Sequence, residues 1–491
     1  MYTFIKINVK NISQKTLNNL RFWKNRKNWY KNIGKTGKMH YNNIGKTGKE
    51  WNFMFYRKIQ EKLNAYYNDK NSKIMVVNGA RQIGKSFIIR ETASKYYKNY
   101  IEINLKEDYD GDKIFANVSK TNDFYLQLSA LYGNKLNNND DTIIFLDEIQ
   151  VYPHLLSMLK SLKLDNKYRY IASGSLLGIT LKHTFIPMGS INEVKMYPMD
   201  FEEFLLANNV GKDVINYLHN CFKNIEPVAD GIHKIILEKF KEYLISGGLP
   251  DSVKAMVLEK NVFKVRDNQK DTYTYYKDDA SQYDEEHSLK IRRIYDIMPS
   301  YMENKVKRIQ FKKIEDNKDA NLIKYQDEFD YLINSGCAIG VKAISDPRFP
   351  LIESSSKNLI KLYFNDVGIL SNILYKNNIS ALLNNDKGIN MGSIYETVAA
   401  MELIAHSHEI YYFDSKKVGE VDFLINDYDN LSILPIEIKS GKDSYEFRAL
   451  PKLIDKNGNY KLNKGYIFTN NNIVKKEDNL YTFPIYFIMF I

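Results

Sequence analysis

Cysteine is scarce in this chain, which has only Cys221 and Cys337 among its 491 residues. Two cysteines so far apart form neither a disulfide framework nor the short spacing of a zinc site, so we expect a reducing, cytoplasmic environment. The N-terminus lacks the apolar core of a signal peptide. The apolar residues 480–491 fall short of the roughly 20 needed to span a bilayer. We therefore expect no membrane partner, and a buried final strand at 480–491.

Acidic residues are almost missing from positions 1–50, which hold 12 Lys and Arg and one acid, Glu50. This stretch carries a formal charge of +11, which is the net charge of the whole chain, so the remainder is neutral. The seven residues that begin at Asn32 recur at Asn43, but two copies are too few for a solenoid. We interpret residues 1–53 as a basic, flexible arm that can touch nucleic-acid phosphates, or else as a disordered tail.

One stretch has the pattern of a phosphate-binding loop. An apolar, strand-like run at 74–77 precedes the loop, and a further apolar run at 87–89 follows it. The loop itself reads Gly79, Ala80, Arg81, Gln82, Ile83, Gly84, Lys85 and Ser86. Main-chain N–H groups and the start of the following helix can hold a polyphosphate there. We predict that Lys85 reaches the outer phosphates and that Ser86 binds a Mg²⁺ ion bridging them.

A second apolar strand, residues 142–146, ends in Asp147 and Glu148. We predict that Asp147 belongs to the metal shell and that Glu148 polarises the attacking water, so that hydrolysis rather than binding alone is expected. A strand ending in two acids is by itself more often a solvated strand end. The phosphate-binding loop about 60 residues upstream favours the catalytic interpretation.

Strands and helices alternate along residues 54–208, which predicts an α/β layer with a parallel sheet. Further strands are expected at 100–105 and 168–172, and helices at 124–132 and 155–162. In such sheets ligands bind at the carboxyl ends of the strands. The phosphate-binding loop, Asp147 with Glu148, and the Ser-Gly-Ser at 173–175 all fall there.

Five motifs together resemble one prokaryotic family. They are the phosphate-binding loop with its Arg-Gln, the run at 146–150, the Ser-Gly-Ser at 173–175, residues 197–204 and residues 246–250. Over residues 54–491 the chain is similar to AAA-type ATPases that carry a C-terminal restriction-endonuclease-like domain of unknown function. The resemblance implies a five-stranded P-loop NTPase core, a helical and winged-helix-like middle, and ATP as the nucleotide. Ser173 or Ser175 would be a sensor of the γ-phosphate, the alternative being a helix cap.

The chain departs from this family at one point. Many relatives carry a Gly-Arg where this sequence has Pro187, Met188, Gly189 and Ser190. An arginine acting on the transferring phosphate is worth on the order of 10³-fold in rate. Its absence favours slow turnover and a switch-like role.

Residues 209–375 are predicted to be helical and then mixed. Helical spacing occurs at 290–297 and 327–333, a turn at 346–350 and a strand at 360–364, which is consistent with a DNA-binding winged-helix module. The acidic, tyrosine-rich stretch 271–286 lacks the spacing of a calcium loop, and we interpret it as a solvated connection.

A second group of polar residues lies in the predicted nuclease-like domain, residues 376–491. Glu396, Asp422, Glu437 and Lys439 have the order and spacing of the restriction-endonuclease core. Asp422 and Glu437 would hold Mg²⁺, Lys439 would orient or activate water, and Glu396 would be a further ligand or its partner. The alternative is a degenerate copy with a structural role only.

Three functions remain open at this stage. The chain is an ATPase that couples nucleotide state to DNA or a protein partner, an ATP-gated nuclease, or a nucleotide-binding scaffold with little chemistry. The intact Lys85, Asp147 and Glu148 favour the first two. The sequence does not give the oligomeric state.

Overall fold

The computed structural model describes residues 54–136, 139–175, 189–279, 285–304, 307–315, 321–354, 356–384, 391–440, 449–455 and 462–491. Residues 54–491 form one compact unit. The predicted arm, 1–53, and the positions Pro187 and Met188 lie outside the described residues. In the ranges given, no helix is long and apolar enough to cross a membrane.

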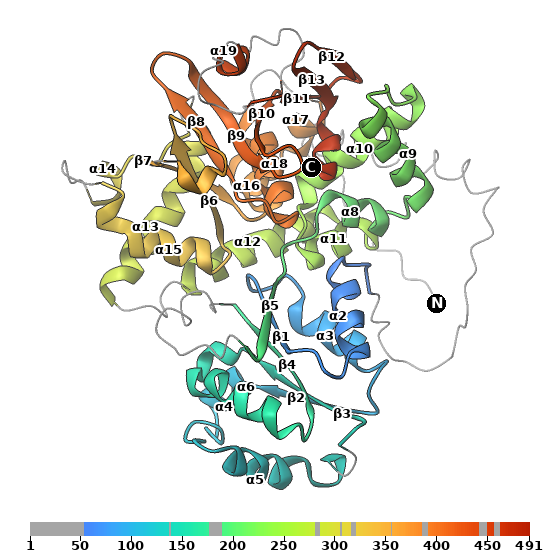
Figure 1. Ribbon diagram of the computed structural model, residues 1–491, viewed down its shortest axis with the longest axis vertical. Helices are drawn as coiled ribbons and strands as arrows, with labels where there is room; N and C mark the ends of the chain where they lie inside the picture. The colour runs from blue at the N-terminus through green and yellow to red at the C-terminus, as the bar shows by residue number, and fades with distance from the viewer. Residues whose placement is uncertain are drawn as a thin grey trace, which may run out of the picture. The chain divides into compact units, whose positions relative to one another are not determined.

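A five-stranded parallel sheet lies in the first third of this unit (Figure 1). Its strands are β1 (Ile74–Asn78), β2 (Asn99–Asn104), β3 (Thr142–Asp147), β4 (Arg169–Gly174) and β5 (Ile191–Lys195), in the order β2-β3-β4-β1-β5. The strands predicted from the sequence are confirmed. Because β3, β4 and β1 are parallel neighbours, their carboxyl ends meet at one edge of the sheet.

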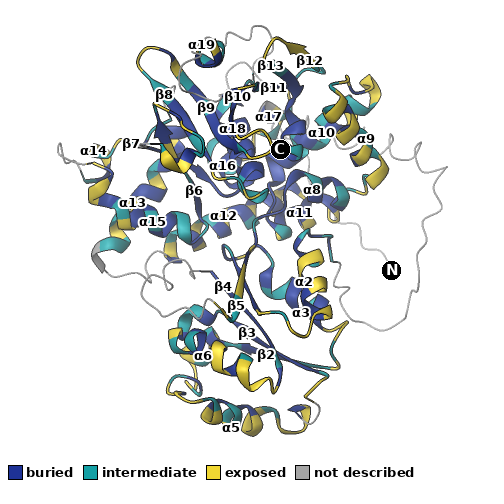
Figure 2. Cartoon of the chain, viewed as in Figure 1, coloured by how far each residue is buried: buried dark blue, intermediate teal, exposed yellow. Residues whose placement is uncertain are grey.

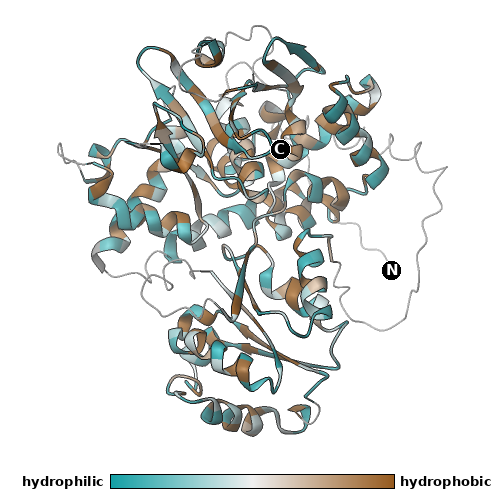
Figure 3. Cartoon of the chain, viewed as in Figure 1, coloured by the Kyte–Doolittle hydropathy of each residue, from teal (hydrophilic) through white to brown (hydrophobic). Residues whose placement is uncertain are grey.

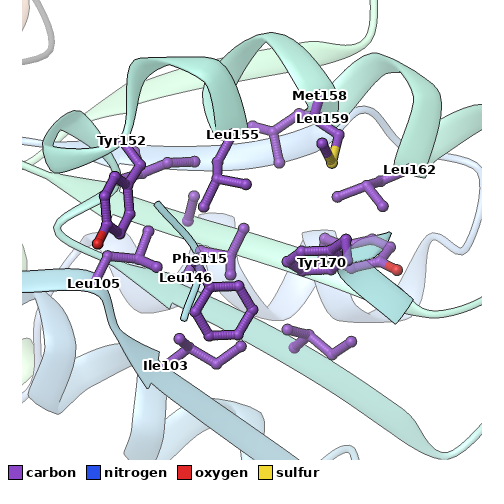
Figure 4. Close-up of a cluster of buried hydrophobic side chains, with 14 of the residues drawn as sticks. Ile103, Leu105, Phe115, Leu146, Tyr152, Leu155, Met158, Leu159, Leu162 and Tyr170 are labelled. Atoms are coloured by element: carbon purple, nitrogen blue, oxygen red, sulfur yellow. The ribbon is translucent and has the colours of Figure 1, made fainter. Parts of the chain in front are cut away.

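Helices cover both faces of this sheet, and strands β1 and β3 are buried along their whole length (Figure 2). These helices are α2 (Ile59–Asn68), α3 (Lys85–Ala93), α4 (Leu105–Asp110), α5 (Thr121–Tyr132) and α6 (Pro153–Asp165), with short 3-10 turns at Gly133–Leu136 and Ile149–Val151. Leu146 of β3 and Tyr170 of β4 pack with Leu155, Leu159 and Leu162 of α6 (Figure 4). The helices predicted at 124–132 and 155–162 are confirmed by α5 and α6.

Most of the middle of the chain is helical, as predicted. Its elements are α8 (Phe201–Ala207), α9 (Lys212–Asn224), α10 (Asp230–Ser246), α11 (Pro250–Val257), α12 (Val262–Asp279), α13 (Glu285–Met302), α14 (Lys312–Glu315), α15 (Gln326–Asn334), α16 (Val367–Tyr375) and α17 (Ile379–Asn384), with 3-10 turns at Ile323–Tyr325 and Leu351–Glu353. The prediction of a solvated connection over 271–286 is wrong for 271–279. These residues are the last turns of α12, and Asp279 is buried because it pairs with an arginine.

An eight-stranded mixed sheet occupies the second half, in the order β12-β13-β11-β10-β9-β8-β6-β7. Its strands are β6 (Ala338–Ile344), β7 (Ser356–Phe364), β8 (Tyr411–Ser415), β9 (Gly419–Asp427), β10 (Ser432–Ile438), β11 (Gly465–Thr469), β12 (Lys475–Glu477) and β13 (Leu480–Pro484), and α18 (Met391–Ala405) and α19 (Ala449–Asp455) accompany them. Strand β10 is largely hydrophobic and buried, whereas the edge strand β12 is hydrophilic (Figure 3). The hairpin of β6 and β7 precedes residue 376, yet β6 pairs with β8 and so extends the C-terminal sheet.

The chain end differs from its prediction. The strand expected over 480–491 stops at Pro484, and a 3-10 helix, η7 (Ile485–Phe490), follows it. Tyr486, Phe487 and Ile488 are fully buried there. An apolar run satisfies burial as a strand or as a helix, so its pattern alone does not distinguish the two.

Candidate active site

The phosphate-binding loop joins β1 to α3 through tightly constrained backbone. Gln82 and Gly84 have φ of 61° and 91°, in the left-handed region that glycine adopts most readily. A Cβ on Gly79 would lie 2.2 Å from the carbonyl oxygen of Met196, so only glycine fits there. Left-handed residues within such a turn direct successive N–H groups to a shared concave side, and the loop is therefore suited to hold an anion.

Lys85, the first residue of α3, points back across the loop. Its Nζ donates hydrogen bonds to the carbonyl oxygens of Gly79 (2.9 Å) and Ala80 (2.8 Å). Burial lowers the pKa of Lys85, and the carboxylates of Glu148 and Asp147 oppose this effect. The structure thus places the Lys85 ammonium group against the backbone of the loop, where the sequence predicts it to contact phosphate.

Asp147, at the end of β3, accepts hydrogen bonds from two hydroxyl groups. Ser86 Oγ donates to its Oδ2 at 2.6 Å, and the Ser173 hydroxyl donates to its Oδ1. Burial raises the pKa of Asp147, and both hydroxyls lower it again. Magnesium prefers few protein ligands, each a hard oxygen, and completes its shell with water and phosphate oxygens. Ser86 and Asp147 fit this requirement, although no three His, Cys, Asp or Glu converge as a metal site in the described ranges.

Glu148 lies beside Asp147 but faces a different set of groups. Its φ of 55° turns the chain, and its Oε2 accepts hydrogen bonds from Ser175 Oγ (3.3 Å) and from the amide of Gln150. The guanidinium Nε of Arg81 is 3.9 Å from the same oxygen. Ser173 therefore contacts the predicted metal carboxylate and Ser175 the predicted water-polarising carboxylate. The helix that Ser175 would cap falls in 176–188, outside the described residues.

Helix α12 contacts the loop through residues that the sequence analysis missed. Thr272 Oγ1 donates to Gln82 Oε1 at 2.5 Å, and the Tyr276 hydroxyl donates to the Arg81 carbonyl oxygen at 2.8 Å. Asp279 forms an ion pair with Arg81 at 2.5 Å. The spacing of 272, 276 and 279 is typical of one helix face and could have identified the face. Nothing in the sequence indicates that the loop is its partner.

The remaining family motifs pack around the same loop. Glu203 caps α8 together with Asp200 and pairs with Arg57 at 3.0 Å, while Arg57 also donates to the Ile83 carbonyl oxygen at 3.0 Å. An ideal Cβ on Gly84 would lie 3.5 Å from Pro250. The motifs at 197–204 and 246–250 thus support the phosphate-binding loop from outside.

The four residues predicted as a nuclease-like site also come together, with their oxygens mostly engaged. Asp422 Oδ2 accepts from the backbone N–H of Ile438 (2.8 Å), and Lys439 pairs with Glu437 at 2.5 Å. Glu396 pairs with Lys307 and accepts a hydrogen bond from Tyr363. Burial raises the pKa of Asp422 well above its ordinary value, and the charges of Glu437 and Glu396 add to this.

Three parts of the chain match known protein families. Residues 71–205 match a family described as AAA domain. Residues 237–380 and 391–488 match two families described as domains of unknown function, DUF8612 and DUF4143. No curated protein matches the chain.

Solved structures with similar folds share little sequence with this chain. A Walker-type ATPase of Pyrococcus abyssi is 15% identical over 65% of this chain and 95% of its own, with a TM-score of 0.37. The RuvB Holliday junction branch migration motor of Thermotoga maritima is 14% identical over 58% and 89%, with a TM-score of 0.27. The Aeropyrum pernix ORC1 protein in complex with DNA is 10% identical over 68% and 93%, with a TM-score of 0.29. At such scores these likenesses support no further argument.

The matched AAA domain coincides with the parallel sheet and its phosphate-binding loop. Residues 71–205 therefore match the AAA domain family where the chain forms an α/β domain with a parallel sheet and a P-loop. The C-terminal half is an α/β region built on a mixed sheet.

Proposed function

We propose that this protein binds ATP at the phosphate-binding loop and hydrolyses it with Mg²⁺. The observation that carries the proposal is the convergence of Lys85, Ser86, Asp147 and Glu148 at one sheet edge. Lys85 contacts the outer phosphates, and Ser86 with Asp147 holds the metal. Glu148, turned away from Asp147 by its left-handed backbone, polarises the attacking water.

Nucleotide state is transmitted to the rest of the protein and to a partner, either DNA or another protein. The loop contacts α12 through Arg81 and Gln82, and Gly336, two residues before β6, packs against Ala80. A change in the loop therefore reaches the mixed sheet through two routes. The excess of positive charge within residues 1–53 favours a polyanion such as DNA as the partner.

The test is ATP turnover by the purified protein with Mg²⁺ and with excess chelator. We expect turnover only with Mg²⁺, and Lys85→Ala is expected to lose nucleotide binding. Lys70→Ala is the matched control, because Lys70 is 78% exposed and belongs to no part of the site. A chain that binds ATP without hydrolysing it would instead be a nucleotide-dependent scaffold.

A nuclease activity of the C-terminal cluster is the second candidate. It is favoured by one observation: Glu437 Oε2 is buried and has no hydrogen-bond partner among the described residues, so it is free to bind a cation. It is opposed by Lys307, which already neutralises Glu396. An active site predicts nicking of DNA with Mg²⁺ or Mn²⁺ that Asp422→Ala abolishes. Cleavage that survives this substitution would come from a contaminant.

A further inference from the structure

Arg81 is the residue of the phosphate-binding loop whose position the proposed ATPase mechanism does not explain. Four of the loop's neighbours hold its side chain in the interior, where it is 8% exposed. Backbone N–H groups suffice to hold a phosphate in such a loop, so anion binding alone does not require the Arg81 side chain to be buried. A buried guanidinium at this place therefore calls for a function.

One side of the guanidinium faces the groups that the ATPase proposal assigns to catalysis. Its Nε donates to Ser175 Oγ at 3.1 Å and lies 3.9 Å from Glu148 Oε2. Ser175 in turn donates to the same Glu148 oxygen. Arg81 is thus next to the carboxylate that polarises water and in the same loop as Lys85.

The other side of the guanidinium is held by α12. Its Nη1 donates to Asp279 Oδ1 (2.5 Å) and to the Tyr275 hydroxyl (2.8 Å), and the guanidinium carbon is 5.5 Å from the centre of the Tyr275 ring. Burial disfavours the charged guanidinium, but Asp279 and Glu148 more than offset this and raise the pKa of Arg81. The charge is therefore permanent and its direction is fixed from both sides.

We propose that Arg81 is the catalytic arginine of this ATPase, supplied by the phosphate-binding loop itself, and that Asp279 and Tyr275 of α12 position it. The inference rests on the proposed ATP hydrolysis. It names a source for the charge that the family's Gly-Arg would provide and that residues 187–190 do not contain.

Arg81 forms no bond in this step and contributes the charge and the fixed direction of its guanidinium. The water oxygen bonds to the γ-phosphorus while the bond from that phosphorus to the bridging oxygen breaks, ADP leaves with the electron pair, and Glu148 takes the proton of the water. Negative charge grows on the phosphate oxygens during this step, and a preorganised guanidinium stabilises it at no further cost of ordering. Because α12 holds the guanidinium, turnover depends on the docking of α12 on the loop.

The experiment compares turnover number and ATP affinity in Arg81→Ala and Arg81→Lys. We expect Arg81→Ala to lose on the order of 10³-fold in kcat while its Kd for ATP changes by only a few-fold, and added guanidinium ion to restore part of the rate. Arg81→Lys keeps the charge and the fold but not the planar fork, so it loses rate as well. Arg348→Ala, which removes a 66%-exposed arginine far from the loop in sequence, is the control for loss of an arginine.

Asp279→Asn tests the positioning role. The substitution still allows a hydrogen bond from Arg81 Nη1 but removes the negative charge that holds the guanidinium, so kcat falls less than in Arg81→Ala and KM stays unchanged. Full turnover in both Arg81 variants, or a defect confined to ATP binding, would overturn the assignment while leaving the ATPase proposal intact. A wild-type protein that does not hydrolyse ATP would remove the proposed function first, and this inference with it.

Discussion

At the scale of single residues, close approaches of backbone fix the identity of several positions near the site. Gly248 is the tightest of them: a Cβ there would lie 2.0 Å from the carbonyl oxygen of Met199 and 2.7 Å from its nitrogen. The same glycine donates its N–H to Asp366 and accepts from the Met199 N–H. The glycines of the motif at 246–250 are thus required by packing between segments rather than by a ligand.

We predict that Gly248→Ala lowers the free energy of unfolding by about 1–3 kcal/mol or more, because backbone atoms cannot move aside as a flexible side chain does. Gly231→Ala is the matched control. It lies in α10 with nothing within 4 Å of the added methyl group, and a helical alanine is favoured by about 1 kcal/mol over glycine. Urea titrations of both variants measure the difference. Equal stabilities would contradict the packing argument.

Site residues that belong to a short sequence motif could be predicted from the sequence. The loop from Gly79 to Ser86, with Asp147 and Glu148, was identified because spacing along the chain encodes the chemistry, and the structure brings these residues together. Asp279 was misread because its partner, Arg81, is 198 positions away and only the tertiary fold reveals it. The sequence pattern of a tyrosine-rich acidic stretch predicts exposure to solvent, because it contains no sign of the arginine that pairs with Asp279 in the fold.

At the scale of elements, helices α8 and α18 meet through a buried carboxyl. Glu402 of α18 accepts the Phe201 N–H at the start of α8 at 2.8 Å. Burial raises the pKa of Glu402 from 4.5 to about 8, the carboxylate of Asp200 adds to the rise, and His406 and Lys58 oppose it. The folded protein therefore keeps a proton on Glu402 that the unfolded chain loses above pH 4.5.

The unfolded state binds fewer protons than the folded state between these two pKa values, so Glu402 makes stability fall as pH rises from about 4.5 to about 8. We predict that Glu402→Gln, which keeps an acceptor for Phe201 without an ionisable group, removes this decline. The variant should match the wild type at about pH 5 and exceed it at about pH 9 in unfolding free energy. A gap that is the same at both pH values would show that Glu402 does not titrate in this way.

Helices and strands could be predicted where the spacing of hydrophobic residues differs between the two, and not where a segment is hydrophobic throughout. Alternating strands and helices over 54–208 indicated the parallel sheet, since strands such as β1 and β3 are short apolar runs between turns, whereas the largely exposed β5 was not predicted. The run at 480–491 is apolar throughout, so the change from β13 to η7 at Pro484 left no periodic signal. Likewise, the hairpin of β6 and β7 has the pattern of any hairpin, and its pairing with β8 is a tertiary fact.

At the scale of the whole molecule, the excess positive charge and the proposed active site lie in different parts of the sequence. Positions 1–50 hold the full net charge of +11, whereas the compact unit that contains the active site begins at Met54. Function and nonspecific attraction to polyanions are therefore separable by truncation.

We predict that deleting residues 1–53 leaves ATP turnover and the melting temperature unchanged and weakens binding to nonspecific duplex DNA. The salt dependence of that binding should become shallower, since fewer counterions are released. A full-length chain with the arm's Lys and Arg replaced by Gln is the control, and it should bind like the truncated protein. A large loss of thermal stability on truncation would contradict the assignment of the arm as dispensable.

The central claim is that the sheet edge holding Lys85, Asp147 and Glu148 hydrolyses ATP, and Glu148→Gln tests it most directly. The amide keeps the shape and the hydrogen-bonding reach of the carboxylate but takes no proton from water. In a single-turnover experiment with Mg²⁺, we predict that the variant binds ATP with wild-type affinity and releases no phosphate, while the wild type converts its bound ATP to ADP. Phosphate release at the wild-type rate from Glu148→Gln would contradict the account.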